Sequence, residues 1–341
     1  MEIALVGLPF SGKTTLFNAL TGSFSPPDGR RQNRAAAVPI DDPRLSAIAE
    51  GVGAPKVHRA AFTFVDLAPP SKGYVNPDAR TADALAHTLR AFENDAAPHI
   101  AGSIDPKRDA QTLEDEFVLA DLQIIENRFV SLKREIQVKK DPEQLKERDV
   151  LLRFQEALEA GRPLRELKTS AEEERLTRGF QFLSMKPLIA VINAGEEAER
   201  QADAPGGGVC VEVCAELEAE LTQLPEEEAL AFRVDLGLPE ESAMKRLTEA
   251  AYEALEVCAF FTANEEETRM RLLPRGATAL EAAESVHTDM AKGFIRAETC
   301  RWDELAEAGS FSKLRSSGKL RLEGKEYVVQ DGDAMLFRFS V

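Results

Sequence analysis

The sequence predicts an α/β fold with a parallel β-sheet, an inserted α-helical hairpin and a compact mixed domain at its C-terminus. Three observations predict this organisation. Short apolar strands alternate with helices over the first 105 residues and again after residue 186, as in parallel sheets. A long heptad-spaced helical stretch interrupts the alternation. After residue 266, short strands and helices return in a different order.

The first element, EIALV (2–6), is a short apolar strand that runs into the loop GLPFSGKT and then the helical segment TTLFNALTG. The loop matches G-x-x-x-x-G-K-[ST], the phosphate-binding loop (P-loop) of nucleotide-binding proteins. We expect Lys13 to reach the β- and γ-phosphates and the Thr14 hydroxyl to ligate Mg²⁺. The candidate nucleotide-binding residues of this loop are contiguous: Gly7, Leu8, Pro9, Phe10, Ser11, Gly12, Lys13, Thr14 and Thr15.

Three further strands are expected to end at the same edge of the sheet. AAFTFVDL ends near Asp66, a candidate second metal ligand, although aspartate is also common in turns after strands. PLIAVINAGE ends in Asn193, with Glu196 three residues on, where guanine-binding proteins carry N-K-x-D. GVCVEVC ends in Cys214–Ala215, where such proteins carry Ser-Ala. These ends predict a nucleotide site at the carboxyl edge of the sheet.

Residues 106–185 predict an antiparallel helical hairpin. Apolar residues spaced like a coiled-coil seam lie at Val118, Leu122, Ile125, Phe129, Leu132 and Ile136. Asp141-Pro142 ends this helix, and Leu151, Phe154 and Leu158 continue on a returning one. Basic residues gather near the tip at Lys133, Arg134, Lys139, Lys140, Lys146 and Arg148. They form either a solvated face or a contact with an anionic partner.

The C-terminal segment predicts a strand at RMRLLP, a helix at TALEAAESVH, a strand at GFIRAE, a hairpin around Gly324 and a final strand at AMLFRFSV. Residues 51–58 and 202–208 are expected to be loops. The net charge of the chain is −17, but residues 270–341 carry 11 basic and 11 acidic residues. The acidic balance argues against non-specific binding to duplex nucleic acid, so contact with RNA would use local patches.

Several classes of protein are not expected. No run of eighteen apolar residues predicts a membrane span, and no leader pattern opens the chain, so we expect a cytoplasmic protein. The four histidines lack metal-ligand spacing. Cys210 and Cys214 alternate on one expected strand face, which indicates two small buried side chains in a reducing compartment.

Beyond these motifs, the whole chain resembles the YchF/Obg-like ATPase family. The matching stretches are GLPFSGKTTLFNALTG, VPIDDPRL, FVDLA, LRAFEND, IAGSIDPKRD, ADLQIIENR, KPLIAVINAGE, RGATALEAAESVHTDMAKGFIRAE and GKLRLEGKEYVVQDGDAMLFRF. The resemblance implies a P-loop NTPase domain (1–105 and 186–265), a helical-hairpin insertion (106–185) and a TGS-like β-grasp domain (266–341). It also implies association with the ribosome, and use of ATP as well as or better than GTP because of Asn193–Glu196.

The sequence departs from the family pattern at its switch elements. Phe10 stands where the family has an asparagine that is associated with potassium-assisted hydrolysis. The D-x-A-G motif reads Asp66-Leu67-Ala68-Pro69, the segment after it is shorter, and no threonine lies between Thr21 and Thr63. We therefore expect Mg²⁺-dependent binding of ATP or GTP with slow hydrolysis, at the ribosome or translation apparatus. The alternatives are an interaction protein that binds nucleotide without useful turnover and, less favoured, a small P-loop kinase.

Overall fold

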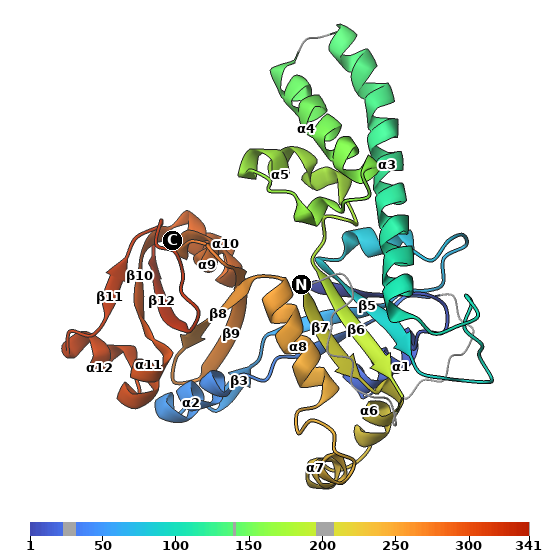
Figure 1. The fold of residues 1–341 in the computed structure, drawn as a ribbon. Coiled ribbons are helices and arrows are strands. Elements are labelled where there is room, and N and C mark those ends of the chain that lie inside the picture. Colours follow the sequence, from blue (N-terminus) through green and yellow to red (C-terminus); the bar gives the residue numbers. More distant parts are fainter. Residues whose placement is uncertain (23–31, 139–140, 196–207, 341) are drawn as a thin grey trace. The chain divides into compact units, whose positions relative to one another are not determined.

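The computed structural model describes residues 1–22, 32–138, 141–195 and 208–340 (Figure 1). The chain divides into two compact units, each with its own sheet. The first unit contains Met1–Val38 and Thr63–Ala254, and the second contains Pro39–Phe62 and Leu255–Val341.

The first unit is built on a six-stranded sheet in the order β2-β4-β1-β5-β6-β7. Its strands are β1 (Glu2–Val6), β2 (Arg34–Pro39), β4 (Ala61–Asp66), β5 (Ala84–Ala91), β6 (Leu188–Ala194) and β7 (Val209–Val213). The pairs β1–β4, β1–β5, β5–β6 and β6–β7 are all parallel. The parallel α/β fold predicted from the sequence is therefore confirmed, and these strands share one carboxyl edge.

Several helices of the first unit pack around this sheet. α1 (Lys13–Thr21) contacts α6 (Ala215–Leu221) and α8 (Ala243–Ala254), while α7 (Glu226–Asp235) lies between those two in the chain. The short 3-10 helix η1 (Pro77–Thr81) and the N-terminal part of α3 (Pro106–Val138) pack on the sheet. Ala79 of η1 and Leu113 and Phe117 of α3 share one apolar cluster with Val6 and Leu85.

The helical hairpin consists of α3 and α4 (Pro142–Glu159), and it is followed by α5 (Ala171–Thr177) and the turns η2 (Leu164–Glu166) and η3 (Arg178–Phe180). The predicted seam packs as expected: Val118 and Ile125 of α3 share one apolar cluster with Leu151 and Phe154 of α4. Asp141 caps α4 by accepting the Glu143 N–H at 3.0 Å, and Pro142 stands at its first turn.

The second unit has a mixed sheet in the order β11-β10-β12-β8-β9-β3. Its strands are β3 (Lys56–His58), β8 (Val257–Ala263), β9 (Glu267–Pro274), β10 (Phe294–Arg301), β11 (Arg321–Glu323) and β12 (Asp333–Phe339). Its helices are α2 (Pro43–Val52), α9 (Ala279–Val286), α10 (Thr288–Lys292), α11 (Trp302–Ala308) and α12 (Phe311–Ser316). Apolar residues of α9 pack against this sheet and form the core of the unit. The central strands β8 and β12 are parallel, and each pairs antiparallel with its other neighbour. This is the arrangement of a β-grasp domain.

The structure differs from the sequence prediction at four places. Pro39–Phe62 belongs to the second unit, although the sequence placed it in the nucleotide domain, and the expected loop 51–58 contains the end of α2 and β3. The expected boundary at 265 falls between the paired strands β8 and β9. The predicted hairpin around Gly324 is wrong, because β11 pairs with β10 and Val328 makes only an isolated bridge to Thr278.

The prediction for the cysteine face of β7 is also wrong. Val211 and Val213 point into the core, whereas Cys210 is exposed and Cys214 stands beyond the strand at the N-cap of α6. The face with the valines buries more apolar area than the face with Cys210, Glu212 and Cys214, so the valine face packs against the core. Within the described residues, no helix combines the length and the apolar character needed to cross a membrane.

Candidate nucleotide site

Close packing around two glycines fixes the backbone of the candidate phosphate loop. Gly7 has φ 149°, and a Cβ atom there would lie 2.5 Å from the carbonyl oxygen of Thr88 on β5. Gly12 has φ 91°, and its Cβ would lie 2.1 Å from the amide nitrogen of Asn193. No side chain fits at either position, which is why the motif requires glycine at both.

The Lys13 ammonium folds back over this loop. Its Nζ donates to the carbonyl oxygens of Gly7 and Leu8, both at 2.8 Å. Burial lowers the pKa of Lys13 to about 8, an effect that the nearby Asp66 carboxylate partly opposes. A bound polyphosphate would favour the charged form. Inside the loop, the buried Ser11 Oγ has no hydrogen-bond partner among the described residues, so one polar group remains to be satisfied.

Thr14 and Asp66, the two predicted metal ligands, lie together. The Thr14 hydroxyl donates to Asp66 Oδ2 at 3.0 Å, and Asp66 is 7% exposed at the carboxyl end of β4. One hydroxyl and one carboxylate are hard oxygen donors that suit Mg²⁺, which usually binds through one or two protein ligands plus phosphates and waters. The donor set therefore fits Mg²⁺.

A third group, Arg34, also reaches Asp66. Arg34 begins β2, and its Nη2 donates to Asp66 Oδ2 at 2.8 Å. Asn33, one residue earlier, accepts the Ala68 N–H at 2.9 Å and donates to Asp78 at 2.6 Å. Sequence reasoning missed both residues, because an Asn-Arg pair at the start of a strand carries no motif.

Asn193 connects the phosphate loop to the end of β7. Its amide nitrogen donates to the Ser11 carbonyl oxygen at 3.0 Å, and its amide oxygen accepts the Ala215 N–H at 3.0 Å. The predicted strand ends therefore do meet at the carboxyl edge of the sheet. Phe92, after β5, lies against Gly12 and Gly195, and it was not identified from the sequence. Glu196 lies outside the described residues.

The remaining residues of the predicted loop differ in exposure. Leu8 is 4% exposed, so it contributes its backbone to the loop and its side chain to the core. Phe10 is 60% exposed and has φ 62°, a left-handed conformation that is uncommon for an aromatic residue. Pro9 is exposed, and Thr15 is half-buried on α1.

His87, on β5 beside the loop, is an unexpected buried titratable group. Burial, together with the nearby positive charges of Lys13 and Arg165, lowers its pKa to about 3. Its Nε2 has no hydrogen-bond partner among the described residues. His87 is therefore neutral at physiological pH and does not serve as a proton donor there.

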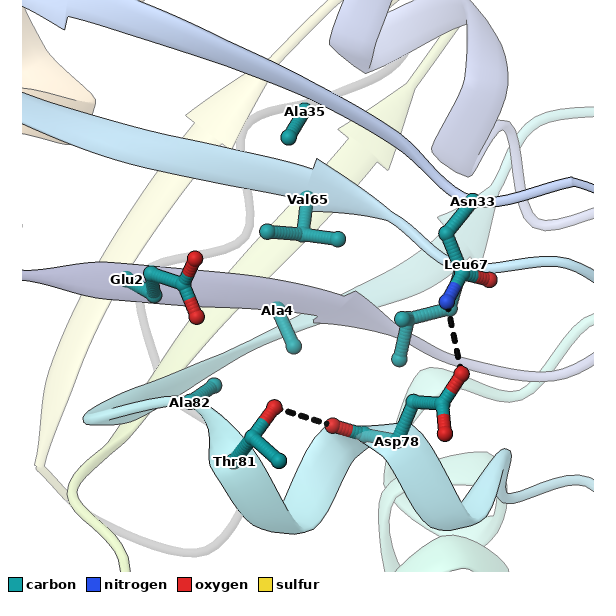
Figure 2. A pocket seen from close by; sticks show the side chains of 9 residues that line it. All are labelled: Glu2, Ala4, Asn33, Ala35, Val65, Leu67, Asp78, Thr81 and Ala82. Carbon is teal, nitrogen blue, oxygen red and sulfur yellow. Dashed lines mark hydrogen bonds between the residues drawn. The ribbon is translucent and has the colours of Figure 1, made fainter.

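A cavity of about 230 Å³ lies beside Asn33, between β1, β4 and η1 (Figure 2). Its polar lining groups point inward from opposite sides, with Asn33 bonded to Asp78 across one end. The carboxylates of Glu2 and Asp78 line it, so it does not suit a phosphate. The phosphate loop does not line this cavity.

Comparisons with known proteins agree with this arrangement. The chain is 37% identical to the "Ribosome-binding ATPase YchF" of Haemophilus ducreyi, over 100% of this chain and 99% of that protein. It is 34% identical to the "Ribosome-binding ATPase YchF" of Bacillus subtilis, over 100% of both chains. The chain belongs to the YchF family.

Two further findings cover the parts of this YchF-family chain. The C-terminal family YchF-GTPase_C, described as "Protein of unknown function (DUF933)", matches residues 257–340, which begin with β8. The solved "Structure of the Schizosaccharomyces pombe YchF GTPase" superposes with a TM-score of 0.83 at 24% identity, covering 99% of this chain and 97% of that one. The YchF fold is thus present over the whole length, and with it the nucleotide-binding P-loop architecture.

Proposed function

We propose that this YchF-family protein binds a purine nucleoside triphosphate with Mg²⁺ at the carboxyl edge of the first sheet. The observation that carries the proposal is the convergence of Lys13, Thr14 and Asp66 at a loop whose glycines leave room only for backbone. The loop N–H groups and the N-terminus of α1 would bind phosphate oxygens. The candidate base-side residues are Asn193, Glu196, Cys214 and Ala215.

The metal, when bound, would neutralise phosphate charge and orient the terminal phosphates. Thr14 and Asp66 would hold it, and Lys13 would leave its two carbonyl partners for the phosphates. Asn193 would position the loop, because its single amide joins Ser11 to Ala215. The kinase alternative has no support from a lid or an acceptor site among the described residues.

We expect ATP to bind at least as tightly as GTP. Guanine selectivity in N-K-x-D proteins needs an aspartate that accepts from the ring N–H and the amine, and this chain has Glu196 there with Ala194 in place of the lysine. One charged hydrogen bond is worth roughly 1.5–3 kcal/mol. Calorimetric titration of both nucleotides in Mg²⁺ measures the difference, and a tenfold preference for GTP would contradict it. Glu196→Asp is the companion variant, expected to shift the preference toward GTP.

We further propose that the chain acts at the ribosome, which would place it in the cytoplasm. The names of the Haemophilus ducreyi and Bacillus subtilis relatives describe ribosome-binding proteins. The tip of the hairpin supports a contact with RNA: Lys133 and Arg134 are exposed on α3, and neither has a carboxylate within ion-pair distance in the described residues. By contrast, Lys146 pairs with Glu172 and Arg148 pairs with Asp149. Lys139 and Lys140 lie outside the described residues.

Reversing the charges of Lys133 and Arg134 to glutamate is expected to weaken ribosome binding and to reduce its salt dependence. Each lost phosphate contact lowers the slope of log affinity against log salt by about one, so the double variant should lose about two. Co-sedimentation with purified ribosomes at several salt concentrations measures this. The matched control is the double variant Arg162→Glu with Lys168→Glu. Arg162 follows the end of α4 that is remote from the tip, and the 18 residues of this helix span about 27 Å. Equal losses in both double variants would contradict a specific tip contact.

A further inference from the structure

We propose that Arg34 is a built-in counter-ion for Asp66 in the nucleotide-free protein and that it competes with Mg²⁺ for this carboxylate. The inference rests on the proposed nucleotide function and adds a residue that sets the metal dependence of binding. It explains how a buried aspartate at a metal position is paired and held in place before the metal binds.

The first argument is the convergence on a single oxygen. Asp66 Oδ2 accepts from both Thr14 Oγ1 at 3.0 Å and Arg34 Nη2 at 2.8 Å. The Asp66 side chain is 9% exposed, and a carboxylate so deeply buried is costly without a nearby positive charge. A divalent cation at this oxygen and the guanidinium would repel each other at contact distance. Occupation of Asp66 by one therefore disfavours the other.

The second argument is that the structure provides a dedicated place for the guanidinium. Arg34 Nη1 donates to Asn18 Oδ1 at 3.3 Å, and the guanidinium carbon lies 4.7 Å from the centre of the Phe17 ring. Phe17 and Asn18 are consecutive residues of α1, the helix that follows the phosphate loop. A cation over an aromatic ring is attracted by the negative face of the ring. Arg34 is thus held by three groups and is not a chance surface contact.

The third argument is the connection to the Asp66 motif. Asn33, adjacent to Arg34, accepts the Ala68 N–H two residues beyond Asp66 and is itself bonded to Asp78 (Figure 2). The start of β2 therefore contacts the motif at two points, the Asp66 carboxylate and the Ala68 N–H group. The chain has no threonine between Thr21 and Thr63 that could contact the metal from this side. The Asn33–Arg34 pair is therefore bonded both to the Asp66 carboxylate and to the backbone that follows it.

The test compares the affinity for ATP in excess Mg²⁺ with that in EDTA, for wild type and Arg34→Gln. Without its competitor, Asp66 should bind the metal more readily, so the Mg²⁺ enhancement of ATP affinity should increase about three- to tenfold. The gain is moderate because the Arg34 side chain is partly exposed, which weakens the competing ion pair. Arg34→Lys keeps the charge and should stay near wild type. Arg162→Gln is the control for loss of a positive charge elsewhere in the same unit.

The outcomes separate the inference from the function on which it rests. An equal loss of ATP affinity in Mg²⁺ and in EDTA would overturn the inference, because Arg34 would then contact phosphate directly. An unchanged enhancement would overturn it as well. Absence of ATP binding by the wild type in both buffers would overturn the proposed function itself. Thermal unfolding of each variant verifies that the variant is folded, and Arg34→Lys provides the comparison if Arg34→Gln is not.

Discussion

Introducing Phe10→Asn and Pro69→Gly together is expected to raise the single-turnover rate of ATP hydrolysis by about 10²–10³-fold, comparable to restoring one donor in an oxyanion hole. In related proteins a glycine after the Asp66 motif donates its N–H to the γ-phosphate. Pro69 has no N–H, and the N–H before it, of Ala68, is already used by Asn33 at 2.9 Å. The Phe10 side chain has no oxygen that could coordinate a monovalent cation, whereas asparagine has one. Asparagine also adopts the positive φ of this position, 62°, more readily than phenylalanine does.

Phosphate release in a single turnover with saturating protein, in sodium and in potassium buffer, measures this effect. The wild type should release phosphate slowly and equally in both buffers. Each single variant is the control for the other position, and only variants with Asn at position 10 should respond to potassium. Release within seconds by the wild type would show that another group completes the site. If the wild type binds ATP but releases no measurable phosphate, the result favours the alternative role, an interaction protein that binds nucleotide without useful turnover.

Replacing Asp121 by alanine is expected to lower the free energy of unfolding by about 3–5 kcal/mol, the cost of breaking a buried ion pair from one side. Asp121 on α3 is fully buried. It accepts the N–H groups of Leu183 and Ser184 at 3.0 and 2.8 Å, the Ser184 hydroxyl at 2.8 Å, and Arg80 Nη1 at 2.8 Å. Its loss removes the acceptor of the Leu183 and Ser184 N–H groups and of the Ser184 hydroxyl in the interior, while Arg80 keeps only the Gln181 carbonyl oxygen at 3.2 Å.

Urea denaturation followed by circular dichroism measures the change. Asp115→Ala is the matched control, because Asp115 is an exposed aspartate of the same helix whose partner is Gln111, and it should change stability by less than about 0.5 kcal/mol. A loss below about 1 kcal/mol in Asp121→Ala would contradict the prediction. The arrangement also explains how the hairpin is anchored, since Asp121 ties α3 to the segment that leads into β6.

Much of the candidate site could be predicted from the sequence because its signals are local. A glycine-rich loop between an apolar strand and a helix has few structural alternatives, so Gly7–Thr14 could be assigned directly. Asp66, Asn193 and Ala215 followed from one rule, that parallel strands present their carboxyl ends at one edge. The seam of α3 was equally local, since heptad spacing reports which helical face is buried.

Other features were decided only by tertiary structure. Pro39–Phe62 joined the second unit because β3 pairs with β9, more than two hundred residues later, and no local periodicity reports such a pairing. Arg34 and Asn33 became part of the site only when β2 took its place beside β4. Cys210 was assigned to the wrong face because alternation gives two faces but not which one meets the core. The sequence by itself determined the chemistry of the loop and the strand ends. Contacts between distant segments decided which strand pairs with β3, which face of β7 is buried and which cation pairs with Asp66. No local sequence pattern encodes the energies of such contacts.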